Sequence, residues 1–345
     1  MNVVYYSSDF FSEMCGVSIE SLLENNTKTD EINIYIVEDN ISDINKERLL
    51  EISNRYNRNI FFIKMPSQND VYPNVKINLG RTYARMALGE ILPDSIDRVL
   101  SLDSDTLVVD SIEDMYNTEF EPNQYVAGVY DCVGEAIQKK VLNVQDNDLC
   151  YCNAGMFLID LKKWRELNVG KLLLNSVLDS ANNGNKMYFL EQDIMNLTFY
   201  KHLKLLHPRY NMLTSIYYFD YEDVVHMKKP VKYYSKQEII NAKNNPAILH
   251  ATTCFYIKKR MWVEESDHPY YELYLKYRKN TGWNTEELIK DSRTNRKKII
   301  AEIWHCMPKK CAITIASFAI NNIRPIYAKI TTKMNISTVA NQSST

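Results

Sequence analysis

The stretch Val99-Leu-Ser-Leu-Asp-Ser-Asp-Thr-Leu-Val-Val109 places two carboxylates directly after a short apolar run. Residues 99–102 predict a buried strand, and Asp103 and Asp105 follow at its carboxyl end. Ligands of open α/β sheets bind at that edge. Two carboxylates separated by one residue can hold a hard divalent cation, which can bridge a diphosphate and offset the cost of burying two anions. The alternative interpretation is an Asp-Ser-Asp turn that caps the next element.

The segments on both sides of this stretch alternate between strand and helix patterns. Strands are predicted over residues 3–7, 32–37, 60–63, 125–130 and 156–159. Helices are predicted over 12–23 with Ser12 as the N-cap, after an N-cap at Ser42, over 82–91 before Pro93, and over 162–174. Beyond Pro208 the pattern is irregular. The alternation indicates an α/β protein with a mostly parallel central sheet flanked by helices.

Composition excludes several classes of protein. The net charge is −2, which disfavours a nucleic-acid partner, and only 9 glycines occur, none arranged as a phosphate-binding loop. The 7 cysteines include no C-x-x-C pair, so neither a disulfide framework nor a zinc ribbon is indicated. No signal peptide is recognisable, and a reducing cytoplasm is expected. The longest uncharged apolar run, residues 311–320, is too short to cross a bilayer.

Charge is concentrated near the C-terminus. Residues 290–333 carry ten basic and two acidic side chains, a net charge of +8, which leaves −10 for the rest of the chain. Apolar side chains, including Trp304 and Phe318, are interleaved with the basic ones. This pattern is typical of a helical segment lying on an anionic membrane surface, and the alternative is a solvated basic helix packing on the acidic body. The predicted organisation is a domain over residues 1–285, this basic segment over 286–333, and a disordered tail over 334–345.

Six blocks occur along the chain in the order found in glycosyltransferase family 8, which the sequence resembles from Val3 to about Trp283. That family includes the glycogenins and the bacterial galactosyl- and glucosyltransferases of lipopolysaccharide outer cores. The blocks are Ser7-Ser-Asp-Phe-Phe11, Thr82-Tyr-Ala-Arg85, Leu102-Asp-Ser-Asp105, Tyr151-Cys-Asn-Ala-Gly155, Glu191-Gln-Asp193 and a last block from His250 to Trp262. The resemblance implies the GT-A nucleotide-diphospho-sugar transferase fold.

The resemblance also implies a donor site for UDP-galactose or UDP-glucose. Phe11 corresponds to the aromatic residue that stacks on uracil. The residues implied to bind the base, the diphosphate or the donor sugar are Ser7, Ser8, Asp9, Arg85, Ser104, Asn153 and Ala154. Asp103, Asp105 and His250 correspond to the metal ligands, and this mixed oxygen and imidazole set suits Mn²⁺, with Mg²⁺ as the alternative cation.

Three residues correspond to positions beside the reacting carbon. Asp131 matches a sugar-contacting aspartate, and Glu191 and Gln192 match a pair beneath the anomeric centre, where the family often has Asp in place of Glu191. Family members retain anomeric configuration. Because an amide is a poor nucleophile, Gln192 is expected to stabilise developing positive charge through its carbonyl oxygen rather than to form a covalent intermediate.

The last block departs most from the family pattern. Its spacing from His250 to Trp262 is three residues longer, and Met261 stands where many members have proline. Arg260 occupies the position of the family's lysine relative to Trp262, and Lys259 lies beside it. Either cation can clamp a diphosphate.

Together these features predict a metal-dependent retaining hexosyltransferase. It would move galactose or glucose from the UDP-sugar to a hydroxyl of a glycan or glycolipid acceptor, in cell-surface polysaccharide or lipopolysaccharide synthesis. The expected location is cytoplasmic, peripheral on the inner face of the cytoplasmic membrane. The alternatives are a non-catalytic sugar-nucleotide-binding scaffold and a glycogenin-like self-glucosylating primer.

Overall fold

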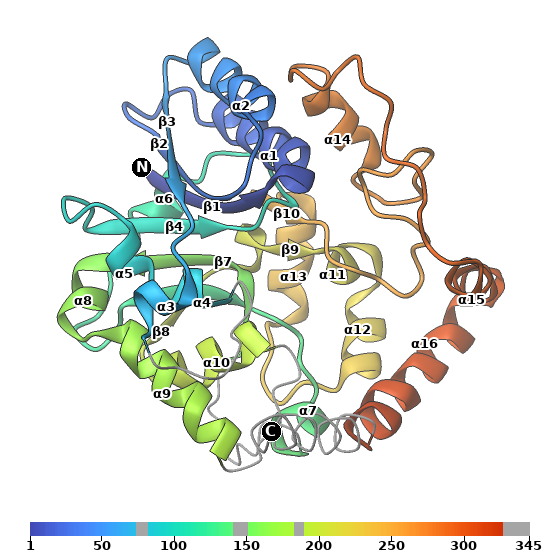
Figure 1. Ribbon diagram of the computed structural model, residues 1–345. Coiled ribbons are helices and arrows are strands. Elements are labelled where there is room, and N and C mark those ends of the chain that lie inside the picture. The colour runs from blue at the N-terminus through green and yellow to red at the C-terminus, as the bar shows by residue number, and fades with distance from the viewer. Residues whose placement is uncertain (74–81, 141–150, 183–189, 327–345) are drawn as a thin grey trace, which may run out of the picture.

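A central sheet of seven strands, ordered β3-β2-β1-β4-β7-β6-β8, organises the computed structural model, which describes residues 1–73, 82–140, 151–182 and 190–326 (Figure 1). The strands are β1 (Asn2–Ser8), β2 (Asn33–Asp39), β3 (Asn59–Lys64), β4 (Arg98–Leu102), β6 (Val126–Tyr130), β7 (Cys152–Asp160) and β8 (Leu203–Leu205). Strand β1 runs parallel to β2 and β4, β2 to β3, and β6 to β8, whereas β7 is antiparallel to β4 and β6. The prediction of a mostly parallel α/β sheet is confirmed.

Helices cover this sheet because its central strands are buried on both faces. The last four residues of β4, Val99–Leu102, are all buried. The helices of this half are α1 (Ser12–Asn25), α2 (Asp43–Arg55), α3 (Gln68–Val71), α4 (Thr82–Met86), α5 (Leu88–Ile91), α6 (Glu113–Tyr116), α7 (Glu135–Lys140), α8 (Leu161–Glu166), α9 (Val169–Asn182) and α10 (Leu190–Phe199). Helix α1 packs on α2 (Figure 1) and buries Met14, Val17 and Leu22, which recur at helical spacing.

A second, three-stranded sheet lies at the carboxyl end of β4. Its central strand β10 (Ile248–His250) pairs antiparallel with β5 (Thr106–Val108) and parallel with β9 (Met212–Leu213). The register sets His250 opposite Thr106 on one side and opposite Leu213 on the other. This small sheet therefore brings a residue far along the chain next to the Asp103–Asp105 turn.

Several local predictions are wrong in detail. Phe11, not Ser12, is the N-cap of α1, because a 3-10 turn over Asp9–Phe11 precedes the helix. The predicted helix over 82–91 is two short helices, α4 and α5. The predicted helix over 162–174 is also two, α8 and α9, separated at Asn168, whose backbone has a positive φ of 51°. Strand β7 begins at Cys152 rather than at residue 156.

The region beyond Pro208 is mainly helical. It contains α11 (Thr214–Tyr218), α12 (Tyr221–Lys228), α13 (Lys236–Asn244), α14 (Tyr271–Arg278), α15 (Asn295–Cys306) and α16 (Lys309–Phe318), followed by a π-helical turn over Ala319–Ile323. The predicted helical character of the basic segment is confirmed by α15 and α16, which run along one edge of the molecule with α16 beside α12 (Figure 1). No helix within the described ranges is long and apolar enough to cross a membrane. The predicted disordered tail over 334–345 lies outside the described residues.

Candidate active site

Three residues predicted as metal ligands meet at the junction of the two sheets. Asp103, Asp105 and His250 each offer one ligand atom, and these atoms lie within 4.8 Å of one another. His250 Nε2 lies 3.1 Å from Asp105 Oδ1 and 3.7 Å from Asp103 Oδ2. Two oxygen ligands and one imidazole nitrogen around a small gap suit a divalent cation of the Mn²⁺ or Mg²⁺ type.

Backbone pairing fixes the positions of these ligands. Asp103 follows β4 and its amide donates to the Gly155 carbonyl of β7 at 2.9 Å, while Asp105 accepts from the Ala251 amide just after β10, also at 2.9 Å. His250 is buried at the end of β10. Because three different strands supply these contacts, the ligand geometry belongs to the sheets rather than to a flexible loop.

The imidazole of His250 is oriented from behind by an amide. Its Nδ1 lies 3.0 Å from Asn211 Oδ1, and the Asn211 amide nitrogen donates to Asn153 Oδ1 at 3.0 Å. Since the Asn211 nitrogen faces another acceptor, its oxygen faces the imidazole, and Nδ1 carries the hydrogen. In the neutral ring, Nε2 then presents its lone pair to the gap between the two carboxylates, as a metal-ligating histidine requires.

Burial and charge pull the pKa values of these groups in opposite directions. Burial alone would lower the pKa of His250, but the neighbouring Asp105 and Asp103 carboxylates outweigh it and raise the value above 6.5. Burial alone would raise the pKa of Asp105, yet His250 and Arg260 hold it below 3.8. Negative charge thus persists at the centre of the trio, which favours a cation there.

Gly155 leaves the space that His250 occupies. A Cβ atom at this position would lie 2.1 Å from His250 Cε1 and 2.9 Å from Asp103 Oδ2. Any side chain here would displace either the imidazole or the carboxylate. Sequence reasoning missed both Gly155 and Asn211. The glycine falls in a recognised block, but the asparagine follows an irregular stretch that gives no signal of its role.

Arg85 on α4 lies between the predicted metal ligand Asp103 and Glu191, which is expected to lie near the donor sugar. Its guanidinium lies 2.6 Å from Asp103 Oδ1 and 2.7 Å from Glu191 Oε1, and it also donates to the Ala154 carbonyl at 2.5 Å. The two carboxylates keep the pKa of Arg85 raised despite burial, whereas burial raises the pKa of Glu191 despite the arginine. The structure therefore brings Arg85, Asp103, Ala154 and Glu191 together, as the sequence predicts for a donor site.

Gln192, at the start of α10, is held by four hydrogen bonds. Its Oε1 accepts from the Asn153 amide at 3.1 Å and from the Ala154 backbone amide at 3.0 Å, and its Nε2 donates to Asp131 Oδ2 at 3.0 Å. The backbone carbonyl of Gln192 accepts from the Asn196 side-chain amide, one helical turn later, at 2.7 Å. Asn153 and Ala154 lie within β7 rather than in the small-residue turn that the family resemblance implies. Both lone pairs of Oε1 are engaged, so a sugar must take the place of one donor for this oxygen to face it.

A cavity of about 240 Å³ opens beside the two aspartates. Ser7, Ser8, Phe11, Asp103, Ser104 and Asp105 line it, together with Tyr6, Asp39 and Met65, which sequence reasoning did not assign. Phe11 is 37% exposed, so its ring face is available for stacking. The signal that Asp39 gives is its position as the last residue of β2, at the same sheet edge as Asp103.

Asp9 is not among the residues that line this cavity. Its Oδ1 accepts from the Ser42 amide at 2.8 Å, the Ser42 hydroxyl at 2.6 Å and the Asn45 amide at 2.8 Å. These hydrogen bonds lower the pKa of Asp9 and tie the 3-10 turn to the start of α2. The Ser42 hydroxyl is used here, which explains why the predicted N-cap makes no capping bond of its own.

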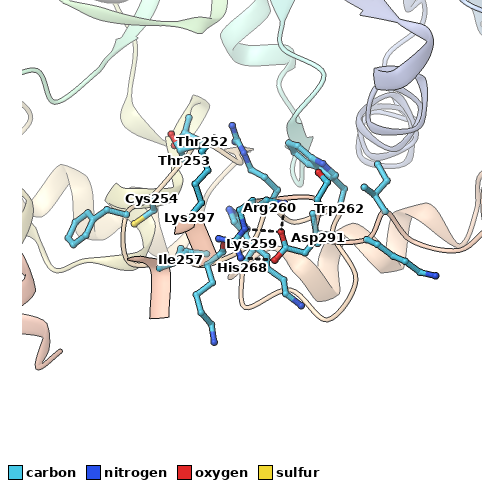
Figure 2. Close-up of a pocket in the computed structure, with 18 of the residues that line it drawn as sticks. Thr252, Thr253, Cys254, Ile257, Lys259, Arg260, Trp262, His268, Asp291 and Lys297 are labelled. Atoms are coloured by element: carbon cyan, nitrogen blue, oxygen red, sulfur yellow. Dashed lines mark hydrogen bonds and ion pairs between the residues drawn. The ribbon is translucent and has the colours of Figure 1, made fainter. Parts of the chain in front are cut away.

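The lengthened last block forms a loop between the metal ligands and the C-terminal helices. Arg260 stacks over Trp262 with 5.2 Å between guanidinium carbon and ring centre (Figure 2), and its Nη1 lies 3.6 Å from Asp105 Oδ2. Lys259 instead points its ammonium at the Glu264 and Glu265 carbonyls, at 2.8 and 3.0 Å. Of the two cations that the sequence leaves open, the structure brings only Arg260 to the aspartates.

Helix α15 packs on this loop from the other side. Trp304 meets Phe255 edge to face with ring centres 5.0 Å apart, and the Tyr256 hydroxyl donates to the Met307 carbonyl at 3.1 Å. An ion pair of 3.2 Å joins Lys258 to Glu302. Trp304 is therefore half-buried against the loop. The same contacts enclose a cavity of about 550 Å³ lined by Cys254, Arg260, Trp262 and Lys297, among others (Figure 2).

Comparisons with known proteins bear on the family and the fold. The sequence model described as Glycosyl transferase family 8 matches residues 2–253. General stress protein A of Bacillus subtilis is 26% identical over 287 residues, covering 83% of this chain and 95% of that protein. The lipopolysaccharide 1,3-galactosyltransferase of Salmonella typhimurium is 22% identical over 305 residues, covering 87% of this chain and 84% of that protein.

Solved structures share the fold. The galactosyltransferase LgtC, in complex with donor and acceptor sugar analogs, superposes with a TM-score of 0.65 at 24% identity, covering 82% of this chain and 96% of its own. The bifunctional glycosyltransferase WbbM, in its apo form, gives a TM-score of 0.67 at 23% identity and covers 83% of this chain and 50% of its own. These likenesses confirm the GT-A fold that the sequence predicts.

Proposed function

Because the chain belongs to glycosyl transferase family 8, we propose that it is a retaining hexosyltransferase that moves galactose or glucose from a UDP-sugar to a hydroxyl of a glycan acceptor. The observation that carries the proposal is the connection between the metal trio and Gln192. His250, Asn211, Asn153 and Gln192 are joined by three successive side-chain hydrogen bonds of 3.0, 3.0 and 3.1 Å. The residues proposed to bind the diphosphate through a cation and those proposed to contact the anomeric carbon would thus belong to one hydrogen-bonded network.

Different residues of the chain would have different roles in the reaction. Phe11, Ser7 and Ser8 would hold the uracil end in the cavity beside β1, and Arg85 and Arg260 would hold the diphosphate. Asp103, Asp105 and His250 would bind Mn²⁺ or Mg²⁺, which supplies Lewis-acid neutralisation of the UDP leaving group. Arg85 is held in place by its ion pairs with Asp103 and Glu191, so its guanidinium would be oriented before the diphosphate binds.

Transfer would join the acceptor oxygen to the anomeric carbon while the bond from that carbon to the β-phosphate oxygen breaks. The electron pair of the broken bond leaves with UDP, and the hydroxyl proton passes to the departing phosphate oxygen. Once the sugar takes the place of one of the two donors to its Oε1, Gln192 would support the positive charge that develops on the sugar, since Asp131 fixes the other side of the amide. Attack from the face that the leaving group vacates gives retention.

The test is UDP release from UDP-galactose and UDP-glucose, measured with Mn²⁺ and with EDTA. Asp105→Asn should lower turnover by about a thousandfold, because several kcal/mol of charge stabilisation are lost. Asp110→Asn is the matched control, since that aspartate is 55% exposed and pairs with Arg209 away from the site. Full activity in EDTA, or in Asp105→Asn, would contradict metal dependence. Nucleotide binding without turnover on any acceptor would instead indicate a scaffold, and hexoses added to the protein itself would indicate a self-glucosylating primer.

We also propose that the enzyme acts in surface-glycan synthesis at the inner face of the cytoplasmic membrane. The support is the outward side of α15 and α16, where Ile299, Ile303 and Phe318 are 60%, 56% and 61% exposed beside exposed Arg296 and Lys310. Exposed apolar and basic side chains together are typical of helices that lie on anionic lipid. Co-sedimentation with vesicles containing phosphatidylglycerol at low salt tests the proposal, and failure of the intact protein to bind would contradict it.

A further inference from the structure

A groove of about 710 Å³ connects Gln192 to the C-terminal helices. This volume is in the range of small-molecule sites. Its polar lining includes Asp131, Asn153, Gln192 and Lys228. Its apolar lining includes Phe255, Trp304, Ala316, Ile320 and Ile323. The groove therefore has a polar part at the reaction site and an apolar part formed largely by α15, α16 and the π-helical turn.

The polar part is already organised by charge and hydrogen bonds. Asp131 accepts from Gln192 at 3.0 Å and pairs with Lys228 at 3.5 Å. Lys228 is the last residue of α12, so that helix reaches the reaction site directly. Carboxylate, amide and ammonium groups in this arrangement suit the hydroxyls of a sugar ring, which both donate and accept.

The apolar part is fixed to the body of the protein. The Ser317 hydroxyl donates to the His226 carbonyl at 2.9 Å, and the Asn321 amide donates to the Met227 carbonyl at 3.0 Å. Lys309 pairs with Asp220 and Asp223, both at 3.3 Å. These contacts all join α16 and the turn after it to α12. These contacts consequently hold the apolar wall at a fixed position relative to Lys228 and to the reaction site.

We infer that the acceptor is a sugar that carries an apolar aglycone, and that the wall of Ile320 and Ile323 binds this aglycone while the sugar lies at Gln192. The inference rests on the proposed transferase function. A free oligosaccharide would leave the apolar wall in water, and Ile323 is 54% exposed without a ligand. An alkyl chain continuing from the reducing end of the acceptor sugar would cover that surface and remove it from water, which favours binding.

The experiment compares methyl and octyl β-glycosides of the same acceptor sugars, with the octyl compounds below their critical micelle concentration. The octyl chain should lower KM on the order of tenfold, as burial of two methylenes predicts, and should leave kcat unchanged. In Ile320→Ser combined with Ile323→Ser the two glycosides should have the same KM, equal to that of the methyl glycoside on the unaltered enzyme. Ile315→Ser is the matched control, because Ile315 is 47% exposed on α16 and does not line the groove.

Binding is measured in parallel by calorimetry with octyl and methyl β-glucoside, so that the inference is decided even if neither sugar is the true acceptor. Tighter binding of the octyl compound that disappears in the double variant supports it. Equal KM and equal binding for both aglycones overturn it while leaving the transferase function intact. Absence of UDP release with every donor and acceptor overturns the proposed function instead, and the calorimetry still reports on the groove.

Discussion

The proposed donor side and the proposed acceptor side of the site are built in different ways. On the proposed donor side, polar groups at strand ends lie against one another, as with His250 at the end of β10 beside Asp103 and Asp105 after β4. On the acceptor side, apolar residues of helices at the C-terminus face a groove and partly face water. Residues at strand ends have little conformational freedom, because backbone pairing fixes them on two sides. On a helix face, in contrast, one side chain can be substituted without moving the others. The first arrangement suits chemistry, and the second suits the choice of acceptor.

Among substitutions that leave the three proposed metal ligands in place, the largest effect should come from a single methyl group on the donor side. Gly155→Ala places a Cβ 2.1 Å from the His250 ring, so the imidazole or Asp103 must move. We expect turnover to fall by at least about a hundredfold, since displacing one ligand disrupts the metal trio. Turnover and Mn²⁺ affinity are measured together with the melting temperature. Gly89→Ala is the control, because its Cβ would meet only side-chain atoms away from the site, of Trp164 at 3.1 Å and of Arg165 at 3.4 Å. Unchanged metal affinity in Gly155→Ala would show that the donor side is less rigid than argued.

Removal of the amide behind His250 should have the next largest effect. Asn211→Ala deletes the acceptor that lies 3.0 Å from His250 Nδ1. Mn²⁺ affinity should fall by about 10- to 100-fold, as is typical when a partner of a ligating histidine is lost. Because the ligands themselves remain, excess Mn²⁺ should restore most of the turnover. A variant with normal affinity, or one that excess Mn²⁺ does not rescue, would contradict this role.

A substitution in the C-terminal helix α15 should have a smaller effect, on the affinity for the UDP-sugar. Trp304→Ala removes the edge-to-face contact with Phe255, in the loop that carries Arg260. The KM for the UDP-sugar should rise about two- to tenfold, the range that such aromatic pairs contribute. Trp304→Phe should keep most of the affinity, and Ile299→Ala, at an exposed position of the same helix, should leave it unchanged. If the alanine variant keeps the original KM, α15 does not position the loop.

The smallest effect on turnover is expected at the buried imidazole of His268, which should instead influence stability. Burial, assisted by Arg260, lowers the pKa of His268 from 6.5 to about 4. Between these values the unfolded chain binds more protons than the folded one, so this group makes stability rise with pH. Its contribution should fall by about 2 kcal/mol from pH 7 to pH 5. Denaturant unfolding at both pH values checks this, and His268→Gln should show a smaller loss between them. Equal losses in both proteins would contradict the assignment.

Much of the donor side was predictable because its signals are local. The apolar run at residues 99–102 followed by two aspartates predicts both the strand and the ligand edge, and the ordered blocks add His250, Arg85 and Gln192. Asn211 and Gly155 were not predictable in the same way. Their roles come from the pairing of β9 and β7 with distant strands, and the sequence does not state that pairing.

For the C-terminal segment, the sequence predicts the type of secondary structure and the surface charge but not the packing. Charge and apolar content predict helices with a basic surface, and α15 and α16 confirm them. The packing of Trp304 on Phe255 could not be predicted, because an aromatic residue among basic ones suits a membrane surface and a protein surface equally well. The predicted boundary at residue 285 stays a proposal, although α16 is joined to α12 by several hydrogen bonds and ion pairs.

The side-chain hydrogen bonds between His250 and Asp131 form a one-way chain. Each amide has one donating end and one accepting end, and a carboxylate can only accept. Asp131 therefore fixes which end of Gln192 faces it, Gln192 fixes Asn153, and Asn153 fixes Asn211. At the far end the imidazole must donate from Nδ1, so in the neutral ring its other nitrogen carries the lone pair. The negative charge of Asp131, beside the proposed sugar site, thus selects the tautomer of an imidazole four hydrogen bonds away, and that tautomer is the one that can bind a cation.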